Sequence, residues 1–388
     1  MLTLETVNLR GWHRAIVVFF SVIGITGASM MVRMPLVRET LHVSNSELGV
    51  LLVFGAVGAL IGLSLVGRFI AHFGTRRAAL LGMSIWFIGT VVQLFALGTH
   101  SAILFSIGGF IAGLGVGNTD VAINVDGSAI EQRLGRAALP RMHAAFSIGA
   151  LVGASLGTLA IVLNIGLVLQ MSIIAVAAYL IPLIGLSHMP IDNGLHTEEQ
   201  KSSGGPRSIS KVVLLLGVGI FGMTLGEGAS NDWLAIGIVD GYKANDAAGG
   251  IAFAVLVATM TVVRFFGGTV TDRLGNSATL RICGSIGLIG LLLIILKINI
   301  VTAWIGAGFW GAGVALAFPL FISAAGELQD PARKVALVST FGYMAFLVGP
   351  PLLGFVAQIV GVLNMYWVIL LFIALSVVVS GAAGTRRR

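Results

Sequence analysis

The sequence has little charge and almost no cysteine. Of its 388 residues only 10% are Asp, Glu, Lys or Arg, whereas 57% are hydrophobic and the mean hydropathy is +1.00. A soluble domain carries about 25% charged residues, so this chain lacks a surface suited to water. The single cysteine, Cys283, excludes an intramolecular disulfide and a cysteine-rich metal site. The composition therefore argues against a soluble enzyme, a nucleic-acid-binding domain and a disordered protein.

The sequence also lacks the motifs of common catalytic and cofactor sites. It contains no phosphate-binding loop, HExxH pair or nucleophile elbow, so we predict no enzyme activity, no bound metal and no organic cofactor. Glycine, in contrast, is abundant at 53 residues, without the Gly-X-Y period of collagen. Because small residues let helices approach closely in lipid, we expect helices that pack through glycine.

Long apolar stretches set the fold class, since a bilayer core takes roughly 20 apolar residues as helix. Residues 335–385 contain no Asp, Glu, Lys, Arg or His and are long enough for two spans with a bend near 361–364. The stretches 78–119 and 141–192 predict two spans each, with turns at 98–101 and 164–166. Single spans are predicted at about residues 15–36, 47–70, 101–130 (the second of the 78–119 pair), 212–239, 247–270, 280–296 and 300–326. We predict an all-α membrane protein of twelve transmembrane helices.

The positive charges predict the orientation. If the N-terminus is cytoplasmic, most of the 23 lysines and arginines fall in inner loops, as membrane topology requires. Both termini are then cytoplasmic, and the net charge of +7 needs no nucleic-acid partner. The first apolar stretch begins near Ala15 without a clear cleavage site, which predicts an uncleaved first helix.

One long polar stretch divides the chain. Residues 188–211 are rich in Gly, Ser and Pro and are interpreted as a cytoplasmic linker. The predicted domains are an N-terminal six-helix bundle, residues 1–187, and a C-terminal six-helix bundle, residues 212–388.

The two halves share short motifs. Gly67 and Gly74 follow the second predicted helix, and Gly268 and Gly275 follow the eighth at the same spacing. A Gly-Ala-Ser triplet recurs in the first and seventh helices, at residues 27–29 and 228–230. Two six-helix repeats are typical of a transporter that rocks around a central site.

With these motifs the sequence resembles the major facilitator superfamily, whose loop motif is roughly G-x-L-x-D-R-x-G-R-R. The second copy matches it at Gly268, Asp272, Arg273 and Gly275. The first copy has Ala71 and His72 in place of the Asp-Arg pair. In the family this Asp locks the cytoplasmic gate, so the resemblance implies gate charges at Asp272 and Arg273 but no such lock in the first half.

A narrower resemblance is to the fucose-permease-like branch and its uncharacterised bacterial inner-membrane relatives. It is carried by residues 33–35, 124–131, 143–147 and 227–233. This resemblance implies a multi-pass protein of the bacterial cytoplasmic membrane and a sugar-like solute. It also implies that the first, fourth, seventh and tenth helices line the path.

Ionisable groups inside the spans are candidate functional residues, because each costs several kcal/mol unless it is paired or hydrated. In the fourth helix Asp120 and Asn124 share a stripe with several glycines, and we expect them to line the central cavity. The alternative is that they make hydrogen bonds between helices. Glu131 lies at the cytoplasmic end, where we expect a structural partner for nearby arginines.

The first and seventh helices carry further candidates. Ser29 and Arg33 share one face, and a guanidinium there can grip a carboxylate or two sugar hydroxyls. The alternative for Arg33 is an ion pair that closes the outer gate, with Asp232 as its partner. Glu227 lies near mid-membrane and shares a face with Asn231.

Two of these acids are candidates for proton coupling, which would make a proton gradient the energy source. We hypothesise that Glu227 or Asp120 exchanges the proton, because both lie deep in apolar spans. Gly226 and Gly228 flank Glu227 and are expected to break or bend the seventh helix there.

The remaining candidates have less specific roles. By resemblance Arg264 lies near His143 or Glu131, as a gate or packing charge, and His143 is interpreted as a satisfied histidine at a helix start or as a proton relay. Trp310 of the tenth helix is a candidate for stacking on a sugar, with core packing as the alternative.

We therefore predict a secondary active transporter, expected as a monomer in the lipid bilayer, that moves a small polar solute by alternating access. One alternative is a proton-driven exporter of drugs or amphiphiles. Glycines at 149, 153 and 157 are similar to a series in such antiporters, but the accompanying proline is absent. The other alternative is a non-transporting membrane receptor or scaffold.

Overall fold

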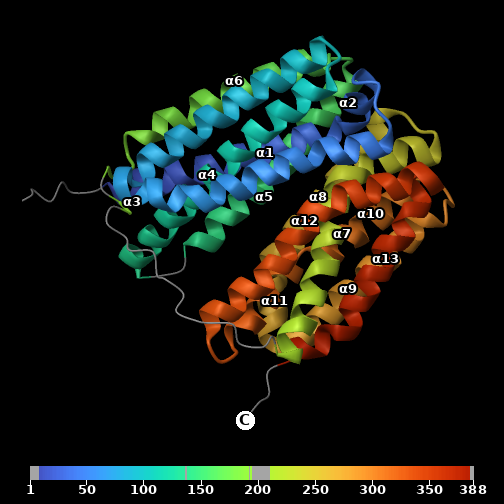
Figure 1. Ribbon diagram of the computed structural model, residues 1–388. Helices are drawn as coiled ribbons and strands as arrows, with labels where there is room; N and C mark the ends of the chain where they lie inside the picture. Colours follow the sequence, from blue (N-terminus) through green and yellow to red (C-terminus); the bar gives the residue numbers. More distant parts are fainter. Residues whose placement is uncertain (1–7, 136–137, 192, 195–209, 385–388) are drawn as a thin grey trace, which may run out of the picture. The chain divides into compact units, whose positions relative to one another are not determined.

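The computed structural model describes residues 8–384 apart from 136–137, 192 and 195–209 (Figure 1). Its described residues form helices joined by short turns. The helices are α1 (Leu9–Val32), α2 (Met34–Thr40), α3 (Asn45–Gly98), α4 (Ala102–Leu134), α5 (Leu139–Val162), α6 (Leu167–Leu186), α7 (Lys211–Tyr242), α8 (Asp246–Leu274), α9 (Asn276–Ile295), α10 (Ile300–Val314), α11 (Ala317–Gly326), α12 (Pro331–Val360) and α13 (Val362–Val379), followed by the 3-10 turn η1 (Ser380–Ala383).

The membrane spans of the structure agree with those predicted from the sequence. Eleven described helical segments are long and apolar enough to cross a membrane. One of them, α3, has 54 residues and holds two spans, because Gly74 (φ 80°, ψ 164°) interrupts it. An uninterrupted helix of that length would measure about 80 Å, more than twice the bilayer core. The twelve predicted spans are thereby confirmed, with the predicted turns at 98–101, 164–166 and Gly361.

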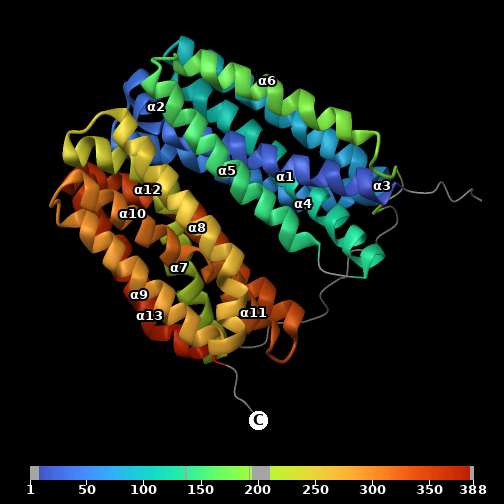
Figure 2. The same ribbon diagram turned by 180° about the vertical axis from the view of Figure 1, so that it is seen from behind.

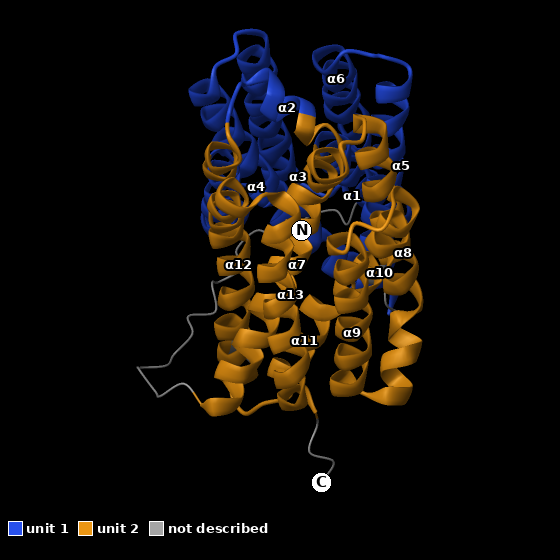
Figure 3. Cartoon of the chain, turned by 90° about the vertical axis from the view of Figure 1, so that its right-hand side faces the viewer, with its two compact units in different colours: residues 1–30, 36–43, 51–200 blue, residues 31–35, 44–50, 201–388 orange. Residues whose placement is uncertain are grey.

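The chain divides into two compact units (Figure 3). Unit 1 comprises residues 1–30, 36–43 and 51–200, and unit 2 comprises residues 31–35, 44–50 and 201–388. Two short pieces of the first sequence half therefore belong to unit 2. One of them begins α3, where the Asn45 backbone N–H donates to the Gln358 side chain of α12 (3.2 Å). Most of the predicted linker, 188–211, lies outside the described residues.

Each unit has its own packing. In unit 1 a cluster of apolar side chains around Trp12, Phe19 and Ile123 joins α1, α3, α4 and α5. In unit 2, α7 packs against α12 and α13, and α9 packs against α10 and α13 (Figure 2). These helices are the frame on which the membrane-embedded polar side chains are held.

Glycines let the helices of unit 1 approach backbone to backbone, as predicted. Gly113 and Gly117 of α4 lie against the carbonyl oxygens of Gly55 and Ala59 in α3, where a Cβ atom would overlap the oxygen. Gly153 of α5 meets α1 in the same way. The glycine series of α5 therefore has a packing role in this chain.

The loop repeat predicted from the sequence has a structural counterpart. Gly74 (φ 80°, ψ 164°) and Gly275 (φ 79°, ψ 165°) adopt nearly the same backbone conformation, each between two helices. A side chain is strained at such positive φ values, which explains why glycine stands at both positions.

We predict that Gly117→Ala destabilises the protein, because the added methyl group overlaps the carbonyl oxygen of Ala59. Overpacking of this kind costs about 1–3 kcal/mol of unfolding free energy. The measurement is the thermal midpoint of the purified protein in detergent. Gly27→Ala is the matched control, since a Cβ at Gly27 of α1 meets nothing within 4 Å. Equal midpoints for the two variants would contradict the close packing of α3 and α4.

Candidate functional site

A line of three polar side chains runs between α4 and α5 in unit 1. Asp120 and Asn124 lie one helical turn apart on α4, and the Asn124 amide donates to the Asp120 backbone carbonyl (2.8 Å) and carboxylate (3.2 Å). Nε2 of His143 lies 3.1 Å from the Asn124 side-chain oxygen. Because an amide oxygen only accepts, the imidazole donates this hydrogen bond.

This line connects residues that the sequence had assigned to different roles. Asp120 and Asn124 are half-buried, and His143 is exposed but lies against the ring of Phe20, with the two ring centroids 4.7 Å apart. The carboxylate is therefore linked, through one amide, to an accessible imidazole. The predicted stripe on α4 identified the first two residues, whereas the contact of His143 depends on how α5 packs against α4.

Unit 2 holds a membrane-embedded ion pair. The Arg264 guanidinium of α8 lies 2.6 Å from the Glu227 carboxylate of α7, and its Nε donates to the backbone carbonyl of Ala315 (3.1 Å). The side chains are 32% and 16% exposed, so both charges are partly withdrawn from solvent. A paired charge with a further backbone acceptor meets the requirement for ionisable groups inside a membrane.

Within unit 2 Arg264 bonds Glu227, and the expected proximity of Arg264 to His143 or Glu131 stays a prediction. The sequence held a signal for this pairing, because Glu227 and Arg264 carry opposite charges in spans of the same half. The Ala315 carbonyl, which is the second acceptor for Arg264, was not predicted from the sequence.

That carbonyl is free because the tenth span is broken. α10 ends at Val314 and α11 begins at Ala317, so Ala315 lies in the break. In a continuous helix the carbonyl of Ala315 would accept from the backbone nitrogen of residue 319, which is a proline and has no N–H. Pro319 thus leaves this acceptor available to Arg264.

The predicted break in the seventh helix is wrong. α7 runs uninterrupted from Lys211 to Tyr242, through Gly226 and Gly228. Gly226 instead makes room for the side chain of Ile373 on α13. Close packing therefore explains this glycine, and the helix discontinuity lies in the tenth span.

Asn231 and Asp232 lie in the second half of α7, beyond Glu227 of the ion pair. Both side chains are half-buried, and among the described residues neither has a hydrogen-bonding or ionic partner. Their neighbour Ser230 is satisfied internally, since its hydroxyl donates to the Glu227 carbonyl (2.7 Å). The amide and the carboxylate are thus the groups of α7 that can bind a solute.

The two polar residues predicted on the first helix have separate environments. The Ser29 hydroxyl is buried in unit 1 and donates to the Gly153 carbonyl of α5 (2.8 Å). Arg33, between α1 and α2, is buried in unit 2, where the carboxylate of Asp246 stabilises its positive charge. The suggested partner of Arg33 was Asp232, and the structure has Asp246 in that role.

Two further predictions change in the light of the structure, and a third is unchanged. Glu131 was expected to pair with arginines, but its carboxylate accepts from the backbone N–H groups of Ala138 (2.8 Å) and Leu139 (3.0 Å), and so caps α5.

Trp310 has no exposed surface and packs edge-on against Tyr366, which argues against stacking on a solute. Asp272 and Arg273 are exposed at the end of α8, where their gate role stays a prediction.

Asp126 of α4 anchors a cluster that the sequence did not single out. Its fully buried carboxylate accepts from the Thr75 hydroxyl (2.8 Å) and the Asn193 amide, and the charge of Arg133 stabilises it. The Asn193 carbonyl accepts in turn from the Thr75 backbone N–H (3.0 Å). This cluster ties the turn at Gly74 to the segment after α6, in the half whose loop motif lacks the Asp-Arg pair.

Comparison with known proteins places the chain in a family. The family model described as Major Facilitator Superfamily matches residues 14–334. An uncharacterised transporter, y4wD of Sinorhizobium fredii, is 31% identical over 96% of this chain and 98% of its own.

Two solved structures share the fold. The nucleoside transporter NupG matches with a TM-score of 0.76 at 15% identity, over 96% of this chain and 98% of its own. The E. coli fucose:proton symporter FucP matches with a TM-score of 0.62 at 15% identity, over the same shares. At such identities the likeness concerns the fold alone, whereas the family model covers most of the chain. The chain therefore belongs to the Major Facilitator Superfamily of multi-pass membrane transporters.

Proposed function

We propose that this transporter moves a small polar solute across the cytoplasmic membrane by alternating access, driven by protons. The observation that carries the proposal is the hydrogen-bonded line of Asp120, Asn124 and His143 inside the membrane-spanning helices of unit 1. A carboxylate in such a place takes or releases a proton as its surroundings change.

Asn124 and His143 have positioning roles in this proposal. The amide N–H stabilises the ionised form of Asp120 through a charge-assisted hydrogen bond. The His143 N–H holds the amide oxygen, so the amide N–H stays directed at the carboxylate. Loss of this hydrogen bond, when α5 moves against α4, frees the amide to turn away from the Asp120 carboxylate.

Of the two acids considered for coupling, Asp120 is the better candidate. Glu227 already forms an ion pair with the Arg264 guanidinium, 2.6 Å away, so the loss of its charge would leave a cation in the span without its ionic partner. The hydrogen-bond donor to the Asp120 carboxylate is a neutral amide. We assign proton exchange to Asp120 and a structural or gating role to the Glu227–Arg264 pair.

The polarity of the solute is inferred from groups left available in α7. Asn231 and Asp232 offer an amide and a carboxylate without partners among the described residues. In a membrane span such groups are costly unless water or a solute satisfies them. The names of two solved relatives in fold, a nucleoside transporter and a fucose:proton symporter, are in keeping with a polar solute.

We predict that Asp120→Asn abolishes accumulation driven by a pH gradient but retains solute exchange at equal pH. The variant keeps the shape and the hydrogen bonds of the side chain but cannot release a proton. The measurement is flux into proteoliposomes, screened with labelled sugars, nucleosides and the dye ethidium, with and without a pH gradient.

Glu39→Gln, which removes an exposed carboxylate of α2, is the control for this experiment. If Asp120→Asn and Glu227→Gln both leave gradient-driven transport intact, the proton-coupling proposal fails. Export of ethidium without any flux of sugars or nucleosides would favour the drug antiporter, and binding without flux would favour a receptor.

A second prediction concerns the ion pair in unit 2. Arg264→Met leaves Glu227 without its cation and the Ala315 carbonyl without its donor, so we expect a loss of about 1–3 kcal/mol of unfolding free energy. Adding Glu227→Leu removes the unpaired charge, and the double variant should recover much of that loss. Thermal unfolding of Arg264→Met, Glu227→Leu and the double variant in detergent completes a double-mutant cycle. Strictly additive losses of stability would show that the pair contributes no coupling energy.

A further inference from the structure

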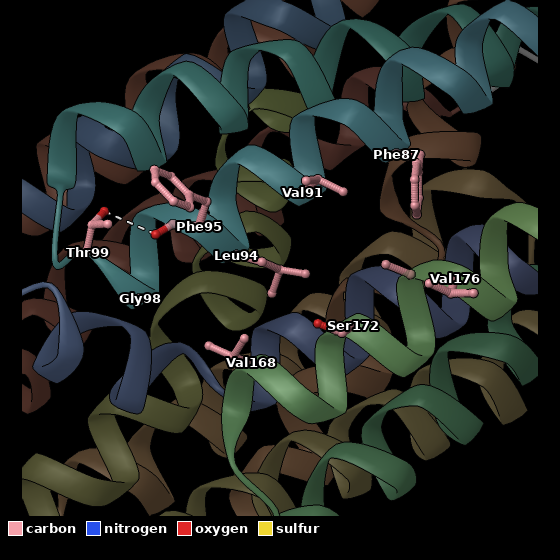
Figure 4. Close-up of a pocket in the computed structure, with 10 residues that line it drawn as sticks. Phe87, Val91, Leu94, Phe95, Gly98, Thr99, Val168, Ser172 and Val176 are labelled. Atoms are coloured by element: carbon pink, nitrogen blue, oxygen red, sulfur yellow. Dashed lines mark hydrogen bonds between the residues drawn. The ribbon is translucent and has the colours of Figure 1, made fainter.

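Unit 1 carries an apolar groove between the second half of α3 and the first half of α6 (Figure 4). Its volume is about 490 Å³, which lies in the range of small-molecule sites. The α3 side is lined from Phe87 to Gly98, with Val91 and Phe95 between them, and the α6 side includes Val168 and Val176.

The groove opens toward the membrane. Val91 and Val176 are each 46% exposed, and Phe95 is 63% exposed. Both helices meet the length and hydropathy of membrane spans, so the medium around these side chains is hydrocarbon. Water is therefore a poor occupant, and so is the polar solute proposed above.

The length of the groove matches one leaflet of a bilayer. From Phe87 to Gly98 the α3 wall rises about 16 Å, at 1.5 Å per residue. A hydrocarbon core about 30 Å thick gives each leaflet about half of that length. The groove begins at the end of α3 and reaches mid-membrane, which is the reach of a single lipid chain.

The polar side chains of the lining are Ser172 on α6 and Thr99 at the end of the α3 wall. Past Gly98 the chain turns through Thr99 and His100, and the Thr99 hydroxyl donates back to the Phe95 carbonyl (3.1 Å), as Figure 4 shows. Nδ1 of His100 lies 2.7 Å from the Thr40 carbonyl, which only accepts, so Nδ1 carries a proton, and Nε2 can donate to an anion such as a phosphate when the ring holds a second proton.

A second imidazole lies beside the first. The ring of His42 stacks on that of His100, with centroids 5.5 Å apart and planes 25° from parallel, and both side chains are exposed. Each histidine occupies a loop outside the spans, at the level where headgroups meet the hydrocarbon. The site thus joins an apolar groove to a polar end, as an amphipathic molecule requires.

We propose that this groove binds one acyl chain of a membrane phospholipid, with the phosphate of that lipid beside His42 and His100. The largely apolar lining, the opening to the bilayer, the one-leaflet length and the polar groups at the end of the α3 wall all fit this occupant. The inference does not depend on the transported solute or on proton coupling.

The test uses the full-length protein in vesicles of phosphatidylethanolamine and phosphatidylglycerol that contain a phospholipid with a photoreactive diazirine in its acyl chain. After illumination and proteolysis, we expect labelled peptides from residues 87–99 and 168–176. Val176→Trp fills the groove and should reduce this labelling about tenfold. Ile173→Trp, on a lipid-exposed position of α6 outside the groove lining, should leave it unchanged.

Two further measurements keep the result interpretable. Competition by unlabelled phospholipid on the wild-type protein reports a specific site even if Val176→Trp fails to fold. Native mass spectrometry of His42→Ala/His100→Ala should show less retained phospholipid than the wild type. The proposal would be overturned if the groove is labelled no more strongly than other lipid-exposed helices, or if Val176→Trp and Ile173→Trp are labelled equally. Displacement of the lipid by a transported solute would also overturn it.

Discussion

The bilayer interior offers polar groups no partner, and the arrangement of this protein follows from that constraint. Arg264 shows it most directly, because its guanidinium is held by the Glu227 carboxylate on one side and by the Ala315 carbonyl on the other. The second contact exists only because Pro319 interrupts the tenth span. A local defect in one helix thus supplies the acceptor that a charge on another helix needs.

Close helix packing through glycine is a second consequence of the membrane environment. Hydrocarbon does not drive helices together, so helices in lipid associate through close contact. Gly113 and Gly117 bring α4 against α3, and this contact sets the side of α4 on which Asp120 and Asn124 lie. The positions of the polar groups in unit 1 therefore depend on residues that have no side chain.

The spans, the turns between them and the loop repeat could be predicted from the sequence, because each depends on a local property: apolar length, a turn residue or a glycine spacing. Asp120 and Asn124 could be predicted as neighbours for the same reason, since one helical turn separates them. The backbone partners of Arg264, Glu131 and Ser29 could not, because they depend on which helices meet and at what rotation. Pro319 marked the break in the tenth span, but only the structure shows which side chain uses the freed carbonyl.

Asp120 in unit 1 and Glu227 in unit 2 have partners of different chemistry, and this difference bears on function. In unit 1 the neutral amide of Asn124 donates the hydrogen bond to Asp120. In unit 2 the partner of Glu227 is a guanidinium that stays charged at any physiological pH. A carboxylate held by neutral donors can lose its charge without leaving a cation unpaired, whereas protonation of Glu227 would strand Arg264. Of these two carboxylates we therefore propose Asp120 for proton exchange and Glu227 as one half of a permanent ion pair.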